Sequence, residues 1–251
     1  MRDLTPFRDF ALKEVEREFM EHYGSPTTVT GPLLCSACPG FVCYAEKTQG
    51  ELLIPKMSKV RSPQQISGMS LKYKYKTDDI YHVTIMPCFD KKLEASRHDF
   101  TTDDGDGKVI KDVDCVLATT EIEKLMVDKL STKSIDEYIL EGTDDIDFIY
   151  SHRGGGSGGY LDYIFRSAAK TFYDVDVTSD LQFTQIRNNK DFQETVLIIE
   201  GEVKLRFAKA YGFRSIQNLV QRLKQKACLK VIKKSKTFYH SSHRIMDRCG
   251  S

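Results

Sequence analysis

The sequence predicts an α/β protein with mostly parallel sheets flanked by helices in two lobes, together with one β-hairpin. Apolar runs of strand length alternate with helical patterns through the first half of the chain, which is the order typical of parallel sheets. Two of these runs end close to a cysteine beside a proline, at Cys38 and at Cys88. Further along, two strand-like segments within Phe192–Ala208 meet at a Glu-Gly pair, as the strands of a hairpin do.

The composition indicates a globular intracellular protein. Its 251 residues include 37 basic and 36 acidic ones, so no overall field favours nucleic acid or a membrane surface. Residues 1–20 contain no apolar signal-peptide core, and no apolar run is long enough to span a bilayer. Seven irregularly spaced cysteines do not suit a secreted disulfide framework, which leaves reduced thiols or metal ligands. We therefore expect a cytoplasmic location.

The first elements are read from caps and periodicity. An N-cap and a first-turn proline open a helix over Thr5–Gly24, and because no strand precedes it we expect an amino-terminal part of the fold to be missing. Pro32–Ser36 is expected to be a short buried strand, followed by a helix over Pro39–Lys47. Ser62–Gln65 is a capping box with proline at the first position, and it opens a helix through Tyr73.

The run Ile80–Met86 predicts a strand buried on both faces that leads to Cys88. Lys91, Lys92 and Arg97 follow at once with Glu94. Cationic groups beside a thiolate site would offset its negative charge. A solvated helix face explains the same residues equally well.

The next stretch contains one loop, one strand and two capped helices. Thr101–Lys111 is rich in Asp and Gly and is expected to be a surface loop, since it lacks the distal Glu of a calcium loop. Val113–Thr119 predicts a strand. Capping boxes at Thr120–Glu123 and Ser134–Glu137 predict helices after it.

The glycine-rich stretch Ser151–Gly159 feeds a helix with one apolar face, Leu161–Phe172. It lacks the features of a P-loop or a dinucleotide fingerprint, so close backbone approach to a bulky group is the preferred interpretation. After the hairpin, a helix is expected from about Ser215, and its pattern dissolves from Lys224 onward. Residues 228–251 are interpreted as a solvated basic tail, because their Cys and His spacing matches no zinc finger we can justify.

Cys38 and Cys88 are the candidate metal ligands. Cysteines at strand ends lie at the carboxyl edge of a sheet, where open α/β folds gather ligand-binding groups. With Pro39 as first helical residue, Cys38 lies at a helix amino terminus, where unpaired amides favour a thiolate. Either cysteine alone is better explained as a small buried apolar residue. The matched contexts of the two favour a ligand pair. Cys43 and Cys115 are expected to be buried and inert.

Four ordered motifs resemble the iron-only hydrogenase large-subunit family. They are Ser36–Lys47 (SACPGFVCYAEK), Arg61–Gln65 (RSPQQ), Met86–Ala95 (MPCFDKKLEA) and Asp112–Leu117 (DVDCVL). Three further segments are more narrowly similar to the eukaryotic branch of this family, the nuclear prelamin A recognition factor-like proteins of cytosolic iron–sulfur protein assembly. These are His152–Tyr160, Arg187–Glu194 and Ala210–Leu219. The resemblance covers the chain from about Asp3 to about Ala227.

The resemblance implies an iron-only hydrogenase large-subunit-like fold of two α/β lobes. It implies that Cys38 and Cys88 correspond to two of four cysteines that hold a 4Fe-4S cluster in the cleft between the lobes. It also implies an assembly factor of the cytoplasm and nucleus without catalytic residues. Its implied partners are the cytosolic iron–sulfur assembly targeting complex and apoprotein clients, with no nucleic acid and no membrane.

The sequence departs from the family pattern at both ends. The family's amino-terminal ferredoxin-like cysteines are absent, and after Cys228 the chain lacks the strand and the close cysteine pair that complete the cluster site. We therefore expect a partial or splice form, with a partial family domain at 1–227 and a divergent basic tail at 228–251. Only two of four ligands are in place, so stable cluster occupancy is expected to fail.

Two alternatives to the assembly factor remain. One is an iron-only hydrogenase, because Lys91 and Glu94 match hydrogenase positions near the di-iron centre and along its proton path. Against it, Ala37 stands where hydrogenases place a cysteine that relays protons, and alanine has no proton to exchange. The other is an interaction module without a cofactor, which is favoured if no other chain supplies the missing ligands.

Overall fold

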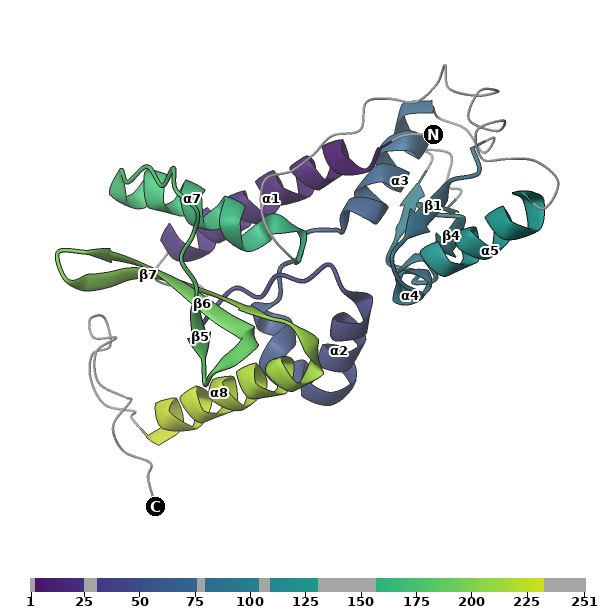
Figure 1. The fold of residues 1–251 in the computed structure, drawn as a ribbon. Helices are drawn as coiled ribbons and strands as arrows, with labels where there is room; N and C mark the ends of the chain where they lie inside the picture. The colour runs from purple at the N-terminus through teal and green to yellow at the C-terminus, as the bar shows by residue number, and fades with distance from the viewer. Residues whose placement is uncertain (1–2, 25–30, 76–79, 104–108, 131–156, 233–251) are drawn as a thin grey trace. The chain divides into compact units, whose positions relative to one another are not determined.

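The structure is a computed structural model that describes residues 3–24, 31–75, 80–103, 109–130 and 157–232 (Figure 1). The chain divides into two compact units, Met1–Tyr160 (unit 1) and Leu161–Ser251 (unit 2). No helix among the described residues is long and apolar enough to cross a membrane. The predicted helix at Ser134–Glu137 and the basic tail from residue 233 onward lie outside the described residues.

Unit 1 combines helices with two small sheets. Its helices are α1 (Thr5–Gly24), α2 (Pro39–Leu53), η1 (Ile54–Lys56), α3 (Pro63–Tyr75), α4 (Asp90–Ala95), α5 (Thr119–Leu130) and η3 (Ser157–Gly159). Its strands are β1 (Val83–Met86), β2 (Thr101–Asp103), β3 (Val109–Lys111) and β4 (Cys115–Ala118). β1 pairs with β4 in parallel, and β2 pairs with β3 in antiparallel fashion. The predicted helix over Thr5–Gly24 and the helix that follows Ser62 are confirmed.

The parallel pair β1–β4 buries one face. Thr84 and Met86 of β1 are buried, and Met86 packs with Val113 and Val116 in a small core. Val83 and Ile85, which point to the other face, are 44% and 50% exposed. The prediction that this strand is buried on both faces is therefore wrong, because no layer among the described residues covers its second face.

Several predicted boundaries in unit 1 need correction. The strand expected at Pro32–Ser36 is a single parallel bridge between Leu34 and Met57, because no longer stretch of chain runs beside it. The helix that begins at Pro39 continues past Lys47 to Leu53, with a break in helical geometry at Gln49. The loop expected at Thr101–Lys111 contains the short strands β2 and β3, which pair with each other.

The two predicted capping boxes within the described part of unit 1 form only in part. The Gln65 amide donates to Ser62 Oγ at 3.5 Å, but the buried Gln65 side chain makes no hydrogen bond within the described structure. At α5 the helix starts at Thr119 instead of following Thr120, and Glu121 Oε2 accepts a 2.8 Å hydrogen bond from the Ala118 amide. The Glu121 carboxylate therefore caps the Ala118 amide, and the helix starts before the predicted Thr120–Glu123 box.

Unit 2 is a three-stranded antiparallel sheet with two helices. The elements are α7 (Tyr160–Tyr173), β5 (Thr184–Ile186), β6 (Asn189–Ile199), β7 (Glu202–Ala210) and α8 (Gly212–Ile232), and the strand order is β5-β6-β7. The predicted hairpin is confirmed, with Glu200 and Gly201 at its turn at φ values of 53° and 78°. Two successive left-handed residues match the right-handed twist of hairpin strands. The third strand, β5, was not predicted.

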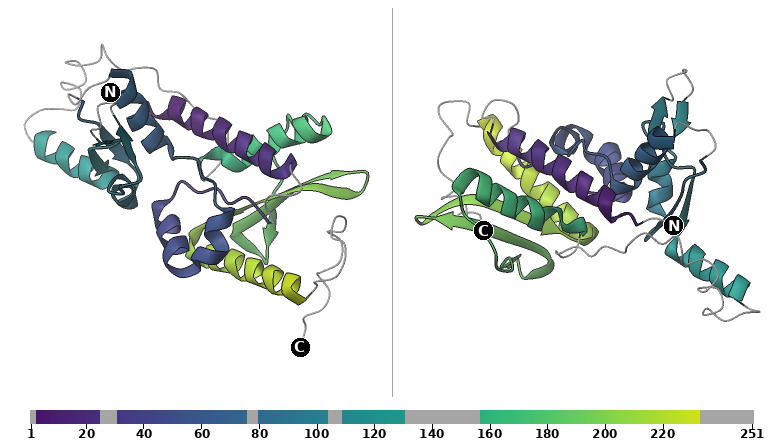
Figure 2. Two further views of the ribbon diagram at one scale, coloured as in Figure 1. Left: turned by 180° about the vertical axis from the view of Figure 1, so that it is seen from behind. Right: turned by 90° about the horizontal axis from the view of Figure 1, so that it is seen from above.

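The helices of unit 2 cover opposite faces of this sheet. Phe165 of α7 meets Phe207 of β7 edge-to-face, with ring centroids 5.4 Å apart. The Arg222 guanidinium of α8 lies over Phe192 of β6 at 5.2 Å. Phe207 is paired with Thr195, three positions from Phe192 along β6, so the two helix contacts fall on opposite faces (Figure 2). α8 extends to Ile232, whereas the sequence ended the helical pattern at Lys224.

The predicted mixture of helices and sheets is confirmed, but antiparallel pairing is more common than expected. Among the described strands only β1 and β4 pair in parallel. The sequence could not show this, because short strands such as β2, β3 and β5 carry too few residues for a periodic signal.

Candidate metal centre

Cys38 lies at the start of α2, as the sequence predicts, but the strand expected before it is only the bridge at Leu34. Cys38 is the N-cap residue, with extended backbone angles (φ −90°, ψ 111°), and Pro39 follows at the first helical position. Its side chain is exposed, and its amide donates to Ser36 Oγ at 3.2 Å. The helix begins with the bond from the Val42 amide to the Cys38 carbonyl. A thiolate here would face the amide-rich end of α2.

Cys88 lies just beyond the carboxyl end of β1 and two residues before α4. Its side chain is also exposed. The Lys91 amide donates to the Cys88 carbonyl, so the chain turns directly from the strand into the helix at this cysteine. The sequence correctly placed Cys88 at a strand end.

The segments that carry the two cysteines meet at Gly40. A Cβ added at Gly40 would lie 2.6 Å from Asp90 Oδ2 and 3.7 Å from Cys38 Sγ. The Asp90 carboxylate, two residues after Cys88, therefore lies against the first turn of α2 beside the Cys38 sulfur. That the Cys38 and Cys88 sulfurs come within metal-ligand reach of each other stays a prediction. In the described ranges, no three His, Cys, Asp or Glu side chains converge to hold a metal ion.

The cationic residues after Cys88 form ion pairs. Lys91 Nζ lies 2.8 Å from Glu94 Oε2, and both side chains are only 10% exposed. Lys92 binds Glu121 at 2.7 Å, and this pair is half exposed. Since acidic groups already neutralise these lysines, they supply less free positive charge to the candidate ligands than the sequence suggested.

Arg97, which follows the end of α4, forms ion pairs with two carboxylates. It binds both Glu46 of α2, at 2.8 Å, and Asp99, at 2.9 Å. The Arg97 guanidinium lowers the pKa of the Glu46 carboxyl, and the two carboxylates raise the pKa of Arg97. This pairing links α2 to the end of α4, so it supports the same helix contact as Gly40 and Asp90.

Cys35 and Tyr160 are partly buried weak acids to which no sequence motif assigns a role. Burial raises the pKa of Cys35 to about 12, and Glu18 adds to this. Burial also raises the pKa of Tyr160 to about 12, with smaller contributions from Cys35 and Glu94. Burial therefore disfavours the thiolate form of Cys35, which makes it a weaker candidate ligand than the exposed Cys38 and Cys88. The sequence could not separate Cys35 from the candidate ligands, because an apolar run precedes metal-binding cysteines and buried thiols alike.

The other predicted residues can be placed only in part. Cys43 and Cys115 are half-buried, so the expectation that both are buried is wrong. Cys43 lies in helix α2 and Cys115 in strand β4, and each side chain keeps part of its surface accessible to solvent. Of the glycine-rich stretch, only Ser157–Gly159 is described, and there the Gly158 carbonyl accepts a 2.9 Å bond from Arg8 Nε. Residues 151–156 lie outside the described residues, so the close backbone approach of this stretch to a bulky group stays a prediction.

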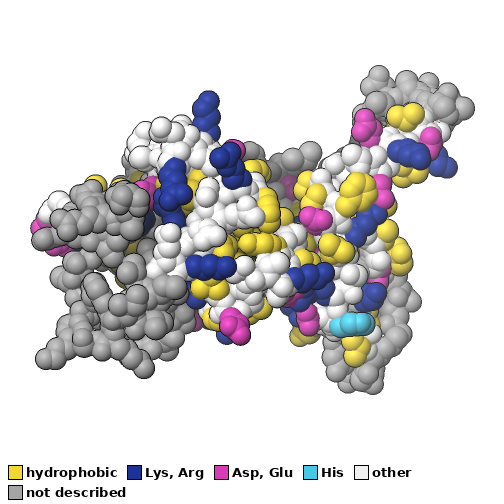
Figure 3. All heavy atoms as spheres, turned by 90° about the horizontal axis from the view of Figure 1, so that it is seen from below, with side chains coloured by type: hydrophobic (Ala, Val, Ile, Leu, Met, Phe, Trp, Pro, Cys, Tyr) yellow, Lys and Arg dark blue, Asp and Glu magenta, His cyan; other side chains and the backbone are white. Residues whose placement is uncertain are grey.

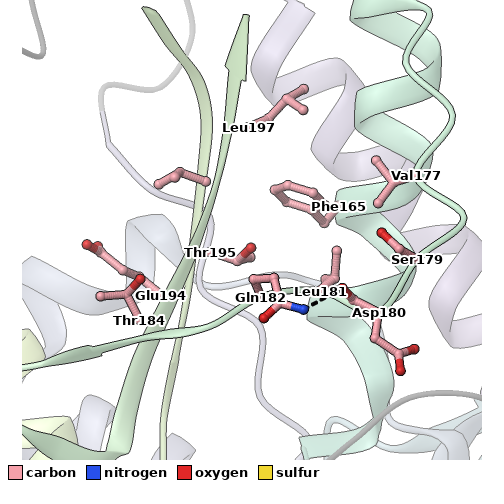
Figure 4. A pocket seen from close by; sticks show the side chains of 11 residues that line it. Phe165, Val177, Ser179, Asp180, Leu181, Gln182, Thr184, Glu194, Thr195 and Leu197 are labelled. Atoms are coloured by element: carbon pink, nitrogen blue, oxygen red, sulfur yellow. Dashed lines mark hydrogen bonds between the residues drawn. The ribbon is translucent and has the colours of Figure 1, made fainter. Parts of the chain in front are cut away.

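A small cavity in unit 2 contains none of the predicted site residues. It has a volume of about 310 Å³ and lies between the segment that leads into β5 and strand β6 (Figure 4). Phe165, Val177 and Leu197 supply apolar walls, and Asp180 and Glu194 supply carboxylates. Nothing in this lining resembles a site for iron or sulfide.

The burial of Cys35 makes a testable contrast with the candidate ligands. At pH 7.5 we expect iodoacetamide to alkylate Cys38 and Cys88 faster than Cys35, because the Cys35 thiol is partly buried and its ionisation is disfavoured. Raising the pH should lower the stability of the fold between pH ~8.5 and ~12, because the Cys35 thiol ionises in the unfolded chain before it does in the folded one. Mass spectrometry of quenched samples measures the labelling. Equal labelling of all three cysteines would contradict the burial of Cys35.

Comparison with known proteins places the chain in a family. The family described as "Iron only hydrogenase large subunit, C-terminal domain" matches residues 1–232. "Cytosolic iron-sulfur assembly component 3" of Rattus norvegicus is 46% identical over 233 residues, which cover 88% of this chain and 48% of that protein. A probable cytosolic Fe-S cluster assembly factor of Nematostella vectensis is 45% identical over 237 residues, 89% of this chain and 52% of that protein. The chain thus spans about half the length of these relatives.

Solved structures support the same fold. An apo FeFe-hydrogenase variant from Chlamydomonas reinhardtii superimposes with a TM-score of 0.65 at 22% identity, covering 90% of this chain and 64% of that one. This likeness concerns the fold alone, and it confirms the hydrogenase-like architecture. With a family match over nearly all of its described residues, the chain belongs to the iron-only hydrogenase large-subunit family.

Proposed function

We propose that this chain is the cluster-binding part of an assembly factor for cytosolic and nuclear iron–sulfur proteins. One observation carries the proposal: relatives named as cytosolic iron–sulfur assembly factors are 43–46% identical to the chain. The hydrogenases of similar fold are only 20–22% identical. Its partners would be apoprotein clients and the complex that targets them. Because the chain covers about half of each relative, this function belongs to the whole assembly factor.

Within this proposal, Cys38 and Cys88 are two ligands of a 4Fe-4S cluster. Both thiols are exposed, both precede helices, and those helices are in contact at Gly40 and Asp90. Two such thiolates could bind two of the iron atoms of a cluster, since thiolates are the usual protein ligands of iron–sulfur clusters. A 4Fe-4S cluster takes four thiolates, and burial makes Cys35 a less favourable third ligand than an exposed thiol. The cluster, when bound, would supply a transferable group of iron and sulfide.

The proposed role is not enzymatic. Ala37 lies directly before Cys38, and its methyl group can neither accept nor donate a proton beside the cluster ligand. Lys91 and Glu94, which match hydrogenase positions, are bound to each other in a buried pair. Hydrogen oxidation or proton reduction is therefore the less favoured function. A module without a cofactor is the second alternative.

Reconstitution distinguishes these functions. The chain is treated anaerobically with iron and sulfide, and absorbance and iron content are measured before and after desalting. We expect a labile cluster that forms and is then lost on desalting, because two thiolates leave part of it exposed. Cys38→Ser or Cys88→Ser should prevent the initial uptake. Cys115→Ser is the matched control, since that thiol lies within strand β4, and it should leave uptake unchanged.

One outcome would contradict the expected lability of the cluster, and two would contradict the proposal itself. A near-stoichiometric cluster that survives desalting would show that other thiols or a second copy complete the site. If Cys38→Ser and Cys88→Ser take up as much iron as the wild type, the two cysteines are not ligands, and the module without a cofactor is favoured. Hydrogen evolution by the reconstituted chain with a reduced viologen would favour the enzyme.

A further inference from the structure

Unit 2 gathers arginine side chains on the face of its sheet that α8 covers. Arg206 Nη1 of β7 binds Glu194 Oε2 of β6 at 2.9 Å. Arg222 of α8 lies over the Phe192 ring at 5.2 Å. Phe192 and Glu194 are two positions apart on β6 and so point to the same face. Arg206 and Arg222 therefore share one surface above neighbouring residues of a single strand.

Arg187 lies in the turn between β5 and β6, and its charge is close enough to Arg222 to lower the pKa of that residue. Arg187 and Asn188 both have left-handed backbone angles, with φ values of 56° and 52°. This conformation is uncommon for residues other than glycine. Asn189 Nδ2, at the end of the turn, donates to Ser215 Oγ in the first turn of α8 at 3.1 Å. The turn is thus fixed to the helix that carries Arg222 two turns later.

Positive charge exceeds negative charge on this surface. The pKa of Arg222 is lowered by burial and by Arg187, with Arg206 adding a smaller effect, while Glu194 acts in the opposite direction. Glu194 is already bound to Arg206. Among the described residues, no carboxylate is hydrogen-bonded to Arg187 or Arg222. The guanidinium groups of Arg187, which is exposed, and Arg222, which is half-exposed, can therefore bind an anionic partner.

We propose that Arg187, Arg206 and Arg222, which we call the arginine surface, bind an acidic segment of a partner protein. Guanidinium groups suit carboxylates because two parallel N–H donors match the two oxygens. Stacking on Phe192 holds the Arg222 guanidinium in place, so less side-chain freedom is lost on binding. The groups extend from a turn to the middle of a strand, which suits carboxylates spaced along a peptide better than one compact phosphate.

A nucleic acid fits this surface less well. The formal net charge of the chain is only +1. On the described part of the face drawn in Figure 3, Lys and Arg side chains lie singly or in small groups among acidic and apolar ones. A phosphate backbone is usually bound by a longer basic tract. The inference uses residues of unit 2 only, so it does not depend on the proposed cluster site.

The test measures binding of a fluorescein-labelled peptide of alternating Glu and Ser to the full chain by fluorescence anisotropy. Arg187→Gln/Arg222→Gln should weaken binding roughly tenfold or more, because two charge-assisted contacts are lost. The matched control Lys170→Gln/Lys209→Gln removes the same charge from α7 and from the opposite face of the sheet, and it should bind like the wild type. Arg187→Lys/Arg222→Lys should fall between the two, since charge is kept and the paired donors are lost.

Thermal denaturation of each variant checks that its fold is retained. If the glutamine double variant is unstable because it loses the contact with Phe192, the lysine double variant, which keeps a cation at residue 222, still tests the proposal. Equal weakening by both double variants would overturn the proposal, because binding would then follow net charge alone. Tighter binding of a single-stranded oligonucleotide, or equal competition by inorganic phosphate, would also overturn it in favour of a phosphate ligand. Loss of cluster uptake by the cysteine variants with peptide binding unchanged would support the independence of the two sites.

Discussion

Replacing Gly68 by alanine is expected to destabilise unit 1 by roughly 2 kcal/mol or more, although alanine is normally the better helix former by about 1 kcal/mol. A Cβ at this position of α3 would lie 2.0 Å from the Asp112 carbonyl oxygen and 2.6 Å from its carbonyl carbon. Both are backbone atoms, so no rotamer change relieves the clash. The helix or the segment before β4 has to move.

That movement would disturb a set of buried polar contacts. Asp112 is fully buried and binds Arg61 at 2.7 Å. Its carbonyl lies 3.1 Å from His82 Nδ1, which would itself be 3.0 Å from the new methyl group. Shifting a buried carboxylate from its guanidinium partner costs more than an ordinary packing defect. The steric cost of the substitution is therefore compounded by an electrostatic one.

Gly50→Ala is the control for this prediction. Gly50 also lies in a helix, α2, but a Cβ there would meet only the flexible end of Ile54 at 3.6 Å. We expect this variant to be neutral or slightly stabilised. Thermal denaturation should show a midpoint lowered by roughly 4 °C or more for Gly68→Ala, given the size of the chain. Equal midpoints for the two variants would mean that α3 and the Asp112 segment are not in close contact.

The parts of the fold that depend on local residues were predictable from the sequence. Pro39 and Pro63 begin helices because their fixed φ and missing amide suit the first helical position. The turn at Glu200-Gly201 follows from the glycine and its alternating flanks. In contrast, the strands β2, β3 and β5 have three residues each, which is too short for an alternating pattern, and only their pairing with the neighbouring strand defines them. No local pattern identifies such strands.

The candidate site shows the same division. Cys38 at a helix start and Cys88 after a strand were placed correctly, because capping and strand patterns are local. The contact between Gly40 and Asp90 was not predicted, since only the packing of α2 on α4 brings these residues together. For a related reason, the sequence left open whether the lysines after Cys88 offset thiolate charge or lie on a solvated helix face. Their acidic partners could be identified only once helix faces and neighbours were known.

Lys91→Met is expected to destabilise the fold by about 3 to 5 kcal/mol, because it leaves the Glu94 carboxylate buried without its cation. The Lys91–Glu94 pair is 2.8 Å apart and 10% exposed on each side. The Lys91 carbonyl, which accepts from Gln64 Nε2, is unaffected by the substitution. The loss therefore reports on the side-chain pair. Urea denaturation gives the free energy of unfolding, provided that the slope stays unchanged.

The neighbouring lysine supplies the matched control. Lys92 binds Glu121 at 2.7 Å in a half-exposed pair, 40% and 36% accessible, so Lys92→Met should cost no more than about 1 kcal/mol. Lys91→Met combined with Glu94→Leu should recover most of the lost stability, because both charges are then removed together. If Lys91→Met costs no more than Lys92→Met, water reaches Glu94. If the double variant stays as unstable as the single one, the lysine stem contributes packing, and the buried charge is not the cause.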